Sequence, residues 1–385
     1  MAHTDITLLG ATGFTGGLTA DYLAKHLPEG ATWAIAGRSR SKLEEVARRI
    51  DAAGGVRPEI VEADTGDDES LAAMAARTRV VVTTVGPYLK YGEGVVRAAA
   101  EAGIAYVDLT GEPQFVDEMW LRYHATAEAS GARIVHACGF DSIPYDLGVL
   151  ATVLALPEGV PLRVRGYIRA AAEFSGGTYH SAINQMSSLR QSARVAGERR
   201  SAEERPAGRV VKGGGRAGRA DGVEGWGIPL PTLDPLVVLR SARALERYGP
   251  DFRYEHYAHL KTLRMTVAGG LGLGVATLAA QVRPLRALML KAKDPGDGPS
   301  EATREKSWFR LTVIGEGGGR TARTLVKGGD PGYTETSRML AESALCLAFD
   351  DLPAVSGQVT TAVAMGVPLI ERLQAAGISF ETEVS

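Results

Sequence analysis

The first 27 residues constrain the fold of this chain more than any other stretch. Asp5–Leu9 has the composition of a buried strand, glycines follow at positions 10, 13 and 16, and a helical pattern runs from Gly17 to Leu27. A strand, a glycine turn and a helix in this order are typical of a dinucleotide-binding unit. Gly10 would permit the tight turn, Gly13 would let the backbone approach a pyrophosphate, and Gly16 would let the helix pack on the strand.

The start of this helix would supply further binding groups, because N–H groups and the positive end of a helix dipole favour phosphate. We therefore predict that the loop contacts the cofactor through Gly10, Thr12, Gly13, Phe14, Thr15 and Gly16. The spacing is G-x-x-G-x-x-G rather than G-x-G-x-x-G. An ordinary glycine-rich turn between strand and helix is therefore the alternative.

The end of the second predicted strand indicates which dinucleotide binds. Thr32–Ala36 reads as a strand, and Gly37, Arg38 and Ser39 follow it without a carboxylate. An NAD site places an acidic residue near this point, whereas a guanidinium forms bidentate hydrogen bonds with a 2′-phosphate. We therefore expect NADPH, held by Arg38 and Ser39. The alternative is a solvated basic helix start, with Ser39 or Ser41 as the N-cap.

Composition excludes several classes of protein. The 385 residues are enough for two domains with substantial cores, and the net charge of −2 gives no case for a nucleic-acid partner. The two cysteines argue against a disulfide scaffold, and the absence of clustered cysteines and His-x-x-x-His spacing gives no support for a metal site. The chain passes from Met1 directly into the first strand, so we expect no signal peptide and a cytoplasmic location.

One apolar segment complicates that expectation. Met265–Val282 contains no charged residue and is bounded by Arg264 and Arg283, a length at the lower limit for a transmembrane helix. Its glycines weaken helix propensity, although Gly270–Gly274 has the small-residue spacing of packed membrane helices. Three roles remain open: a buried or half-exposed helix, contact with a lipid substrate or the inner face of the plasma membrane, and a true span.

Strands and helices alternate as far as about residue 140. The predicted strands are Ile6–Leu9, Trp33–Ala36, Glu59–Glu62, Val80–Thr84, Ala105–Asp108 and Arg133–Ala137, with helices between them. This alternation predicts an α/β fold, a Rossmann-type doubly wound parallel sheet that binds ligands outside the carboxyl ends of its strands.

The alternation ends after Pro144. Leu162–Phe174 has the pattern of a strand in an open sheet, and Trp308–Ile314 and Thr321–Lys327 flank a glycine turn as in a β-hairpin. We predict an NADP-binding Rossmann domain over residues 1–140 and an α+β substrate or lipid domain with an antiparallel sheet over 141–350. A helical C-terminal segment over 351–385 could return to the first domain.

Residues that follow the other parallel strands complete the predicted cofactor site, because strand ends border the ligand in this fold. Gly86 would let the backbone pass the ribose or the nicotinamide. The residues assigned to the cofactor on this basis are Asp64, Thr84, Val85, Gly86, Gly111 and Gly139.

Four residues are candidates for catalysis. Tyr88 would point into the cleft, and its alternative is a structural ring packed on the loop. Asp141 lies in the polar stretch before the domain crossover, and its alternative is an N-cap, with Ser142, for a helix over Tyr145–Leu156. Tyr179 and His180 follow a glycine pair at a helix start and are candidate proton donors.

Motifs spread along the chain resemble a known family. Four stretches are similar to the saccharopine dehydrogenase-like oxidoreductases: Gly10–Gly16, Thr84–Tyr88, Tyr106–Glu112 and Gly139–Pro144. Four later stretches resemble the actinobacterial trans-acting enoyl reductases: Gly328–Tyr333, Met339–Leu345, Gly357–Gln358 and Ala364–Gly366. The resemblance extends from the first strand to the final helix.

The resemblance implies an NADPH-dependent reductase of lipid or polyketide acyl chains that lack a cis-acting reductase domain. Hydride would pass to the β-carbon of an α,β-unsaturated thioester. The substrate would be a hydrophobic acyl chain or lipid, either free or bound to an acyl-carrier protein, and the enzyme could be a homodimer. Arg283, Arg286, Lys291 and Lys293 could accept an acidic carrier, or could simply form a solvated helix face. Two other functions remain open: a ketone or imine reductase, and a non-catalytic NADP-binding, lipid-associated scaffold.

Overall fold

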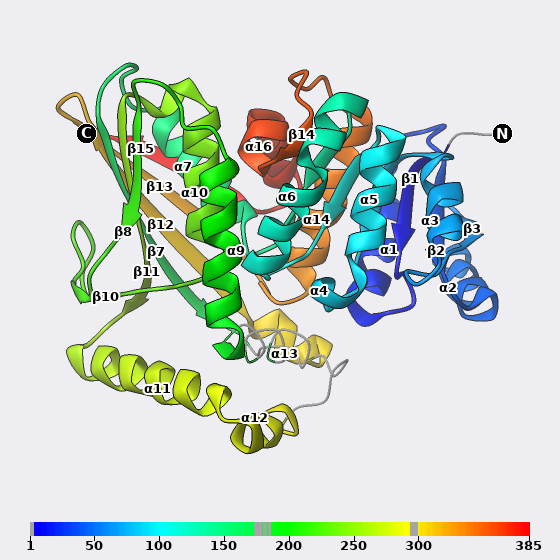
Figure 1. Ribbon diagram of the computed structural model, residues 1–385, viewed down its shortest axis with the longest axis horizontal. Helices are drawn as coiled ribbons and strands as arrows, with labels where there is room; N and C mark the ends of the chain where they lie inside the picture. The colour runs from blue at the N-terminus through cyan, green and yellow to red at the C-terminus, as the bar shows by residue number, and fades with distance from the viewer. Residues whose placement is uncertain (1–3, 173–178, 180–182, 184–185, 293–298) are drawn as a thin grey trace. The chain divides into compact units, whose positions relative to one another are not determined.

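A computed structural model describes residues 4–172, 179, 183, 186–292 and 299–385 of the chain. The chain forms two compact units (Figure 1). Unit 1 comprises Met1–Phe140 and Gly332–Ala376, and unit 2 comprises Asp141–Pro331 and Gly377–Ser385.

Unit 1 is built on a parallel sheet of seven strands in the order β14-β6-β5-β4-β1-β2-β3. The strands are β1 (Thr4–Leu9), β2 (Trp33–Gly37), β3 (Glu59–Glu62), β4 (Thr78–Thr83), β5 (Ala105–Asp108), β6 (Arg133–Val135) and β14 (Gly357–Val359). The order of β1 to β6 is that of the doubly wound dinucleotide-binding fold, with its topological switch point between β1 and β4. The predicted Rossmann-type sheet is confirmed.

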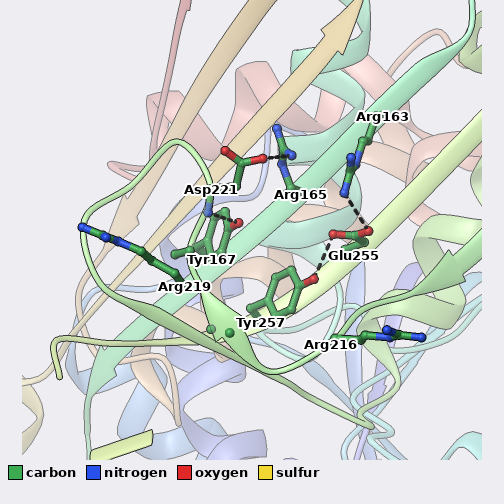
Figure 2. A pocket seen from close by; sticks show the side chains of 11 residues that line it. Arg163, Arg165, Tyr167, Arg216, Arg219, Asp221, Glu255 and Tyr257 are labelled. Carbon is green, nitrogen blue, oxygen red and sulfur yellow. Dashed lines mark hydrogen bonds and ion pairs between the residues drawn. The ribbon is translucent and has the colours of Figure 1, made fainter. Parts of the chain in front are cut away.

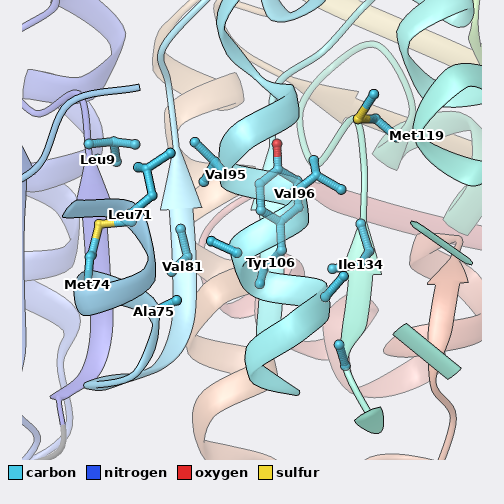
Figure 3. Packing of buried hydrophobic residues seen from close by; sticks show 14 of the residues in the cluster. Leu9, Leu71, Met74, Ala75, Val81, Val95, Val96, Tyr106, Met119 and Ile134 are labelled. Carbon is cyan, nitrogen blue, oxygen red and sulfur yellow. The ribbon is translucent and has the colours of Figure 1, made fainter. Parts of the chain in front are cut away.

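Helices cover both faces of this sheet, which explains why its central strands are almost continuously apolar. The helices of the N-terminal part are α1 (Phe14–His26), α2 (Arg40–Ala52), α3 (Asp68–Ala75), α4 (Tyr88–Tyr91), α5 (Glu93–Ala102) and α6 (Pro113–Ser130). Figure 3 shows the packing on one face, where Val81, Tyr106 and Ile134 of neighbouring strands meet apolar side chains of α3 and α5.

The C-terminal part of the chain completes unit 1. Helix α14 (Thr334–Phe349) packs on α1, β4 and β5, and β14 pairs with β6. Helices α15 (Thr361–Ala364) and α16 (Gly366–Ala375) follow. The hydroxyl of Tyr22 donates to Glu342 Oε1 at 2.6 Å, and Arg372 donates to Glu342 Oε2 at 3.2 Å.

The expected boundary at residue 350 is therefore wrong. Helix α14, with Leu340, Ala341, Ala344 and Leu345 fully buried, packs on β1, β4 and β5 of the parallel sheet and therefore belongs to unit 1. The segment 351–385 is also not entirely helical. It contributes β14 to unit 1 and β15 (Ser379–Val384) to the sheet of unit 2.

Unit 2 has an eight-stranded sheet in the order β15-β13-β12-β7-β11-β10-β9, with β8 paired to β11. Its other strands are β7 (Leu162–Ala171), β8 (Val210–Gly214), β9 (Gly218–Arg219), β10 (Trp226–Pro229), β11 (Asp251–Leu260), β12 (Trp308–Gly317) and β13 (Arg320–Gly328). Pairing is antiparallel except between β7 and β11 and between β8 and β11. The expected hairpin is β12–β13, closed by Gly318 and Gly319 with φ of +58° and +75°, as a two-residue turn of this kind requires.

The longer helices of unit 2 are α7 (Ile143–Leu154), α9 (Leu189–Ala202), α10 (Asp234–Ala244) and α11 (Leu263–Gln281); α12 (Arg283–Leu290) and α13 (Glu301–Lys306) are shorter. Helix α7 lies against β12 and β13 and is almost entirely buried. It begins two residues before the predicted start at Tyr145, since Pro144 suits the first turn of a helix.

Candidate functional site

The glycine loop joins β1 to α1 at the switch point of the sheet in unit 1. Gly10 has φ of +98°, and a Cβ there would lie 2.7 Å from Thr84 Oγ1 and 2.8 Å from Val85 Cγ2. A Cβ on Gly16 would lie only 2.1 Å from the Gly10 carbonyl oxygen. The Thr84 hydroxyl donates to that same oxygen at 3.2 Å. Gly10 and Gly16 are therefore required by packing within unit 1, where two strand ends and a helix start touch.

Gly13 differs from the other two glycines because it is exposed. The nearest described protein atom to a Cβ there would be the Gly10 oxygen, at an ordinary 3.5 Å. Gly13 is the N-cap of α1 and offers no side chain to the first helical turn, whose N–H groups lack intrahelical acceptors. This is the geometry in which a helix start binds phosphate. The loop, together with Arg49 of α2, borders a cavity of about 350 Å³.

The remaining loop residues present side chains on the outside of unit 1. Thr12 and Phe14 are exposed and Thr15 is half-buried. The ring of Phe14 meets the ring of Tyr333 edge to face, with centroids 4.7 Å apart. The hydroxyl of Ser337 donates to the Thr15 carbonyl at 3.3 Å.

Tyr333 and Ser337 were not predicted as site residues. They lie more than 300 residues after the loop in sequence and reach it because α14 packs on α1. The only available signal was the Gly328–Tyr333 motif, which marks the family but does not show what it contacts.

The end of β2 presents an arginine that a ligand can use. Arg38 is exposed and forms no ion pair with the residues that the structure describes. Arg40 instead pairs with Glu44 at 3.2 Å and with Glu62 at 3.3 Å. Ser39 is the N-cap of α2, but its side chain makes no capping hydrogen bond. An unpaired guanidinium with no carboxylate at the strand end fits a 2′-phosphate.

The other predicted cofactor residues lie in the loops at the same edge of the sheet. Asp64 is half-buried and accepts a hydrogen bond from the Gly66 N–H at 2.9 Å, closing a turn. Thr84 and Val85 lie against Gly10 as described, and Gly86 is exposed. Gly111 is half-buried in the loop between β5 and α6.

Gly139, the last predicted cofactor residue, is closely packed by protein atoms. It is buried, and a Cβ there would lie 2.7 Å from Leu109 Cδ2 and 3.2 Å from Thr336 Cγ2. The hydroxyl of Thr336 also accepts a hydrogen bond from the Phe140 N–H at 3.1 Å. The missing side chain thus makes room for neighbouring protein atoms, and nothing in this packing requires a cofactor.

The expectation that Tyr88 points into a cleft is corrected by its hydrogen bonds. The side chain is only 7% exposed, and its hydroxyl donates to the Thr83 carbonyl and accepts from the Leu109 N–H, both at 3.1 Å. Burial raises the pKa of Tyr88 well above its ordinary value, and the nearby Asp108 raises it further. Tyr88 therefore has the structural role that was its alternative.

Asp108, at the end of β5, organises the neighbouring strand ends. Its buried carboxylate accepts the N–H groups of Thr110 and Ala137 on Oδ1, at 3.1 and 2.8 Å. Oδ2 accepts from the Tyr106 hydroxyl at 2.9 Å and lies 2.6 Å from His136 Nδ1. Ala137 has φ of +60°, a conformation that these contacts hold in place.

His136 is oriented by Asp108 and buried beside the rings of Tyr106 and Phe115. Its Nε2 has no hydrogen-bond partner among the described residues. The pair fixes the polar stretch after β6, and His136 was not among the predicted site residues.

The three remaining catalytic candidates belong to unit 2. Asp141 is exposed, and the N-cap of α7 is Ser142, whose side chain makes no capping hydrogen bond. The capping role proposed as the alternative for Asp141 is therefore wrong. Tyr179 is half-buried, and His180 lies outside the described residues.

A cavity of about 130 Å³ lies on the sheet of unit 2 (Figure 2). Arg165, only 2% exposed, pairs with Asp221 and Glu316, and Arg163 pairs with Glu255 at 3.3 Å. Figure 2 shows two further lining arginines, 216 and 219, pointing away from the centre. The guanidinium groups here are paired or divergent and do not converge on a substrate carboxylate.

In the described part of the chain, no group of three or more His, Cys, Asp or Glu side chains is arranged so that it could hold a metal ion. Both cysteines, Cys138 and Cys346, are buried and free.

Comparison with known proteins agrees with this architecture. The family model described as the saccharopine dehydrogenase NADP binding domain matches residues 6–135. A Mycobacterium tuberculosis protein provisionally named a trans-acting enoyl reductase is 38% identical over 98% of this chain and 97% of its own length. The trans-acting enoyl reductase of Mycobacterium ulcerans is 35% identical over 97% and 96% of the two chains.

Among solved structures, an apo saccharopine dehydrogenase (L-Glu forming) from Saccharomyces cerevisiae has a similar fold. The TM-score is 0.56 over 99% of this chain and 100% of that chain, at 12% identity. At this identity the likeness concerns the fold alone.

Proposed function

We propose that this chain, which belongs to the trans-acting enoyl reductases within the saccharopine dehydrogenase-like oxidoreductases, reduces the C=C bond of an α,β-unsaturated acyl substrate. As a member of this family it is an NADPH-dependent reductase. The substrate would be a lipid or polyketide acyl thioester, either free or attached to a carrier protein. The nearly full-length match to relatives named for this reaction carries the enoyl assignment.

The geometry of unit 1 fits the cofactor that this reaction requires. The exposed Gly13 and the first-turn N–H groups of α1 would hold the pyrophosphate. Arg38 and Ser39 would hold the 2′-phosphate at the end of β2. When bound, NADPH supplies the hydride that the β-carbon of the substrate accepts.

The protein must also stabilise negative charge on the thioester oxygen and protonate the α-carbon. The hydroxyl of Tyr88 is unsuited to either task because both of its hydrogen bonds are made inside unit 1. Tyr179, His180 or water would supply the proton. Backbone N–H groups would stabilise the oxyanion.

Cofactor preference is tested by fluorescence titration of NADPH and NADH against wild type, Arg38→Ala and Arg40→Ala. A hydrogen bond to a charged group contributes about 1.5–3 kcal/mol, so Arg38→Ala should lose NADPH affinity by roughly 10- to 150-fold and leave NADH affinity unchanged. Arg40→Ala is the matched control, because Arg40 already pairs with Glu44 and Glu62. Equal loss in both variants would contradict the assignment of Arg38.

The enoyl assignment is tested by NADPH consumption with a trans-2-enoyl thioester and mass analysis of the product. Saturation of the C=C bond would support the proposal. Turnover only with a ketone or an imine would replace it with the broader reductase activity. Tight NADPH binding with no turnover on any acyl substrate would favour a non-catalytic scaffold.

A further inference from the structure

Helix α11 is apolar around its whole circumference and yet lies on the outside of unit 2. An 18-residue window of this helix has a mean hydropathy of 1.4, and only 12% of that window is buried. Leu271, Val275 and Leu278 are 66%, 66% and 71% exposed. A helix that is apolar on all sides is normally enclosed by protein or by lipid. Within unit 2, α11 contacts mainly β10, β11 and α12 (Figure 1).

The apolar surface continues into α12. Leu285 and Leu288 are exposed there, and none of the residues of this helix is buried. Nine large apolar side chains are exposed along the two helices: Leu263, Met265, Val267, Leu271, Val275, Leu278, Val282, Leu285 and Leu288. An exposed apolar surface this long marks an interaction site.

The charged residues within the segment that forms these two helices have one sign. Between His256 and Ala292 the chain contains five lysines and arginines and no aspartate or glutamate: Lys261, Arg264, Arg283, Arg286 and Lys291. The basic residues lie just before and early in α11 and along α12, so they flank the apolar stretch at both ends. Basic residues beside an apolar helix face are typical of helices that lie on anionic lipid.

The sheet topology argues against a single transmembrane crossing. Strands β11 and β12, which precede and follow the two helices, both pair with β7 in one sheet. A segment that leaves and re-enters the same sheet must cross a bilayer an even number of times. Among the described residues only α11 is long and apolar enough to cross. Helix α12 has 8 residues and would extend about 12 Å, far less than the roughly 30 Å of hydrocarbon.

We propose that α11 and α12 form a membrane-binding surface that lies along an anionic bilayer. The apolar side chains of α11 would enter the acyl-chain region, and the five basic residues would contact lipid phosphates. The inference concerns only unit 2 and does not depend on enoyl reduction. Other occupants of the same surface are a second copy of the chain or an acidic carrier protein.

Vesicle flotation with the full-length protein tests this surface. We expect binding to vesicles of phosphatidylcholine with 30% phosphatidylglycerol, weaker binding at high salt, and little binding to phosphatidylcholine alone. Arg283→Glu/Arg286→Glu should weaken binding at least about 20-fold, because each cation near an anionic surface contributes several-fold in affinity. Lys25→Glu/Arg320→Glu, with the same change in net charge at exposed residues elsewhere, should bind like wild type.

A second pair of measurements addresses insertion. Leu271→Ser/Leu278→Ser should bind more than about tenfold more weakly, because two apolar side chains no longer leave water. A polarity-sensitive dye on Leu278→Cys should shift to the blue on anionic vesicles, and both natural cysteines are buried and so poorly accessible to the label. Thermal unfolding of these variants, followed by circular dichroism, should match that of wild type and verifies that unit 2 folds.

Four results would overturn the proposal. The first is that the wild-type protein does not bind anionic vesicles, and the second is that neither double variant changes its binding to them. The third is a wild-type dimer that Leu271→Ser/Leu278→Ser converts to monomers. The fourth is binding of an acidic carrier protein, but not of vesicles, that Arg283→Glu/Arg286→Glu abolishes. Failure of the enoyl reductase assay would leave the vesicle result unaffected, so the two proposals fail separately.

Discussion

Replacing Gly16 by alanine tests whether the glycine loop is shaped by packing inside unit 1. The new Cβ would lie 2.1 Å from the Gly10 carbonyl oxygen and 2.7 Å from Thr84 Oγ1. The first contact is with backbone, which cannot rotate away, so β1 and α1 would have to separate. Gly13→Ala is the matched control, because its Cβ would lie 3.5 Å from the nearest described atom and its φ is −80°.

The expected changes in stability differ in size. Overpacking a close contact costs about 1–3 kcal/mol, and a backbone collision places Gly16→Ala near 3 kcal/mol. For a unit of this size each kcal/mol lowers Tm by roughly 2–4 °C, so the variant should melt about 6–12 °C lower. Gly13→Ala should change stability by less than about 1 kcal/mol, because alanine restricts the unfolded chain but is less favourable than glycine at the N-cap of α1.

Thermal unfolding followed by circular dichroism without cofactor measures these shifts, and NADPH titration completes the comparison. Gly16→Ala should lose stability and NADPH affinity together. Gly13→Ala should keep its Tm and lose NADPH affinity at least about tenfold, since its methyl group occupies space that the pyrophosphate needs. An unchanged Tm for Gly16→Ala, or equal destabilisation by both changes, would refute this account of the loop.

Two further predictions concern charged side chains in unit 1. Asp108→Asn should lower the stability of unit 1 by about 1–3 kcal/mol in urea unfolding, because an NH2 group replaces one carboxylate oxygen and cannot accept the two hydrogen bonds made to it; unchanged stability would show that the network is not needed. Burial alone would raise the pKa of Asp350, but hydrogen bonds from Arg372 hold it below its ordinary value. This stabilisation is present at neutral pH and is lost as pH falls below about 4 through the folded-state pKa. Arg372→Met should therefore lose about 1–3 kcal/mol at pH 7, and its difference from wild type should shrink as pH falls below about 4, whereas a constant difference would contradict the role of Asp350.

The parts of the site that could be predicted from sequence are local. A strand, three glycines and a helix start place Gly10, Gly13 and Gly16 in one turn whatever surrounds it, and the residue after β2 must lie near the same sheet edge. Family resemblance added the enoyl reductase hypothesis, which sequence patterns alone do not contain.

The parts that could not be predicted depend on distant contacts. The direction of the Tyr88 side chain depends on the Leu109 N–H, and the packing of Gly139 depends on Thr336. Neither partner is visible in local spacing. The boundary at 350 was misplaced for the same reason, since an amphipathic helix such as α14 does not reveal which sheet it covers.

Unit 1 is formed from two parts of the sequence that are far apart, and this has a consequence for synthesis of the chain. After Phe140, roughly 190 residues must be translated before α14 begins at Thr334. At about 5–20 residues per second, this leaves the part of the parallel sheet that α14 contacts uncovered for about 10–40 s. The N-terminal part therefore emerges from the ribosome with apolar side chains of β4 and β5 exposed on that side. Expressing residues 1–140 alone would make that condition permanent, and such a fragment should aggregate, whereas one fused to residues 332–376 through a flexible linker should stay in solution.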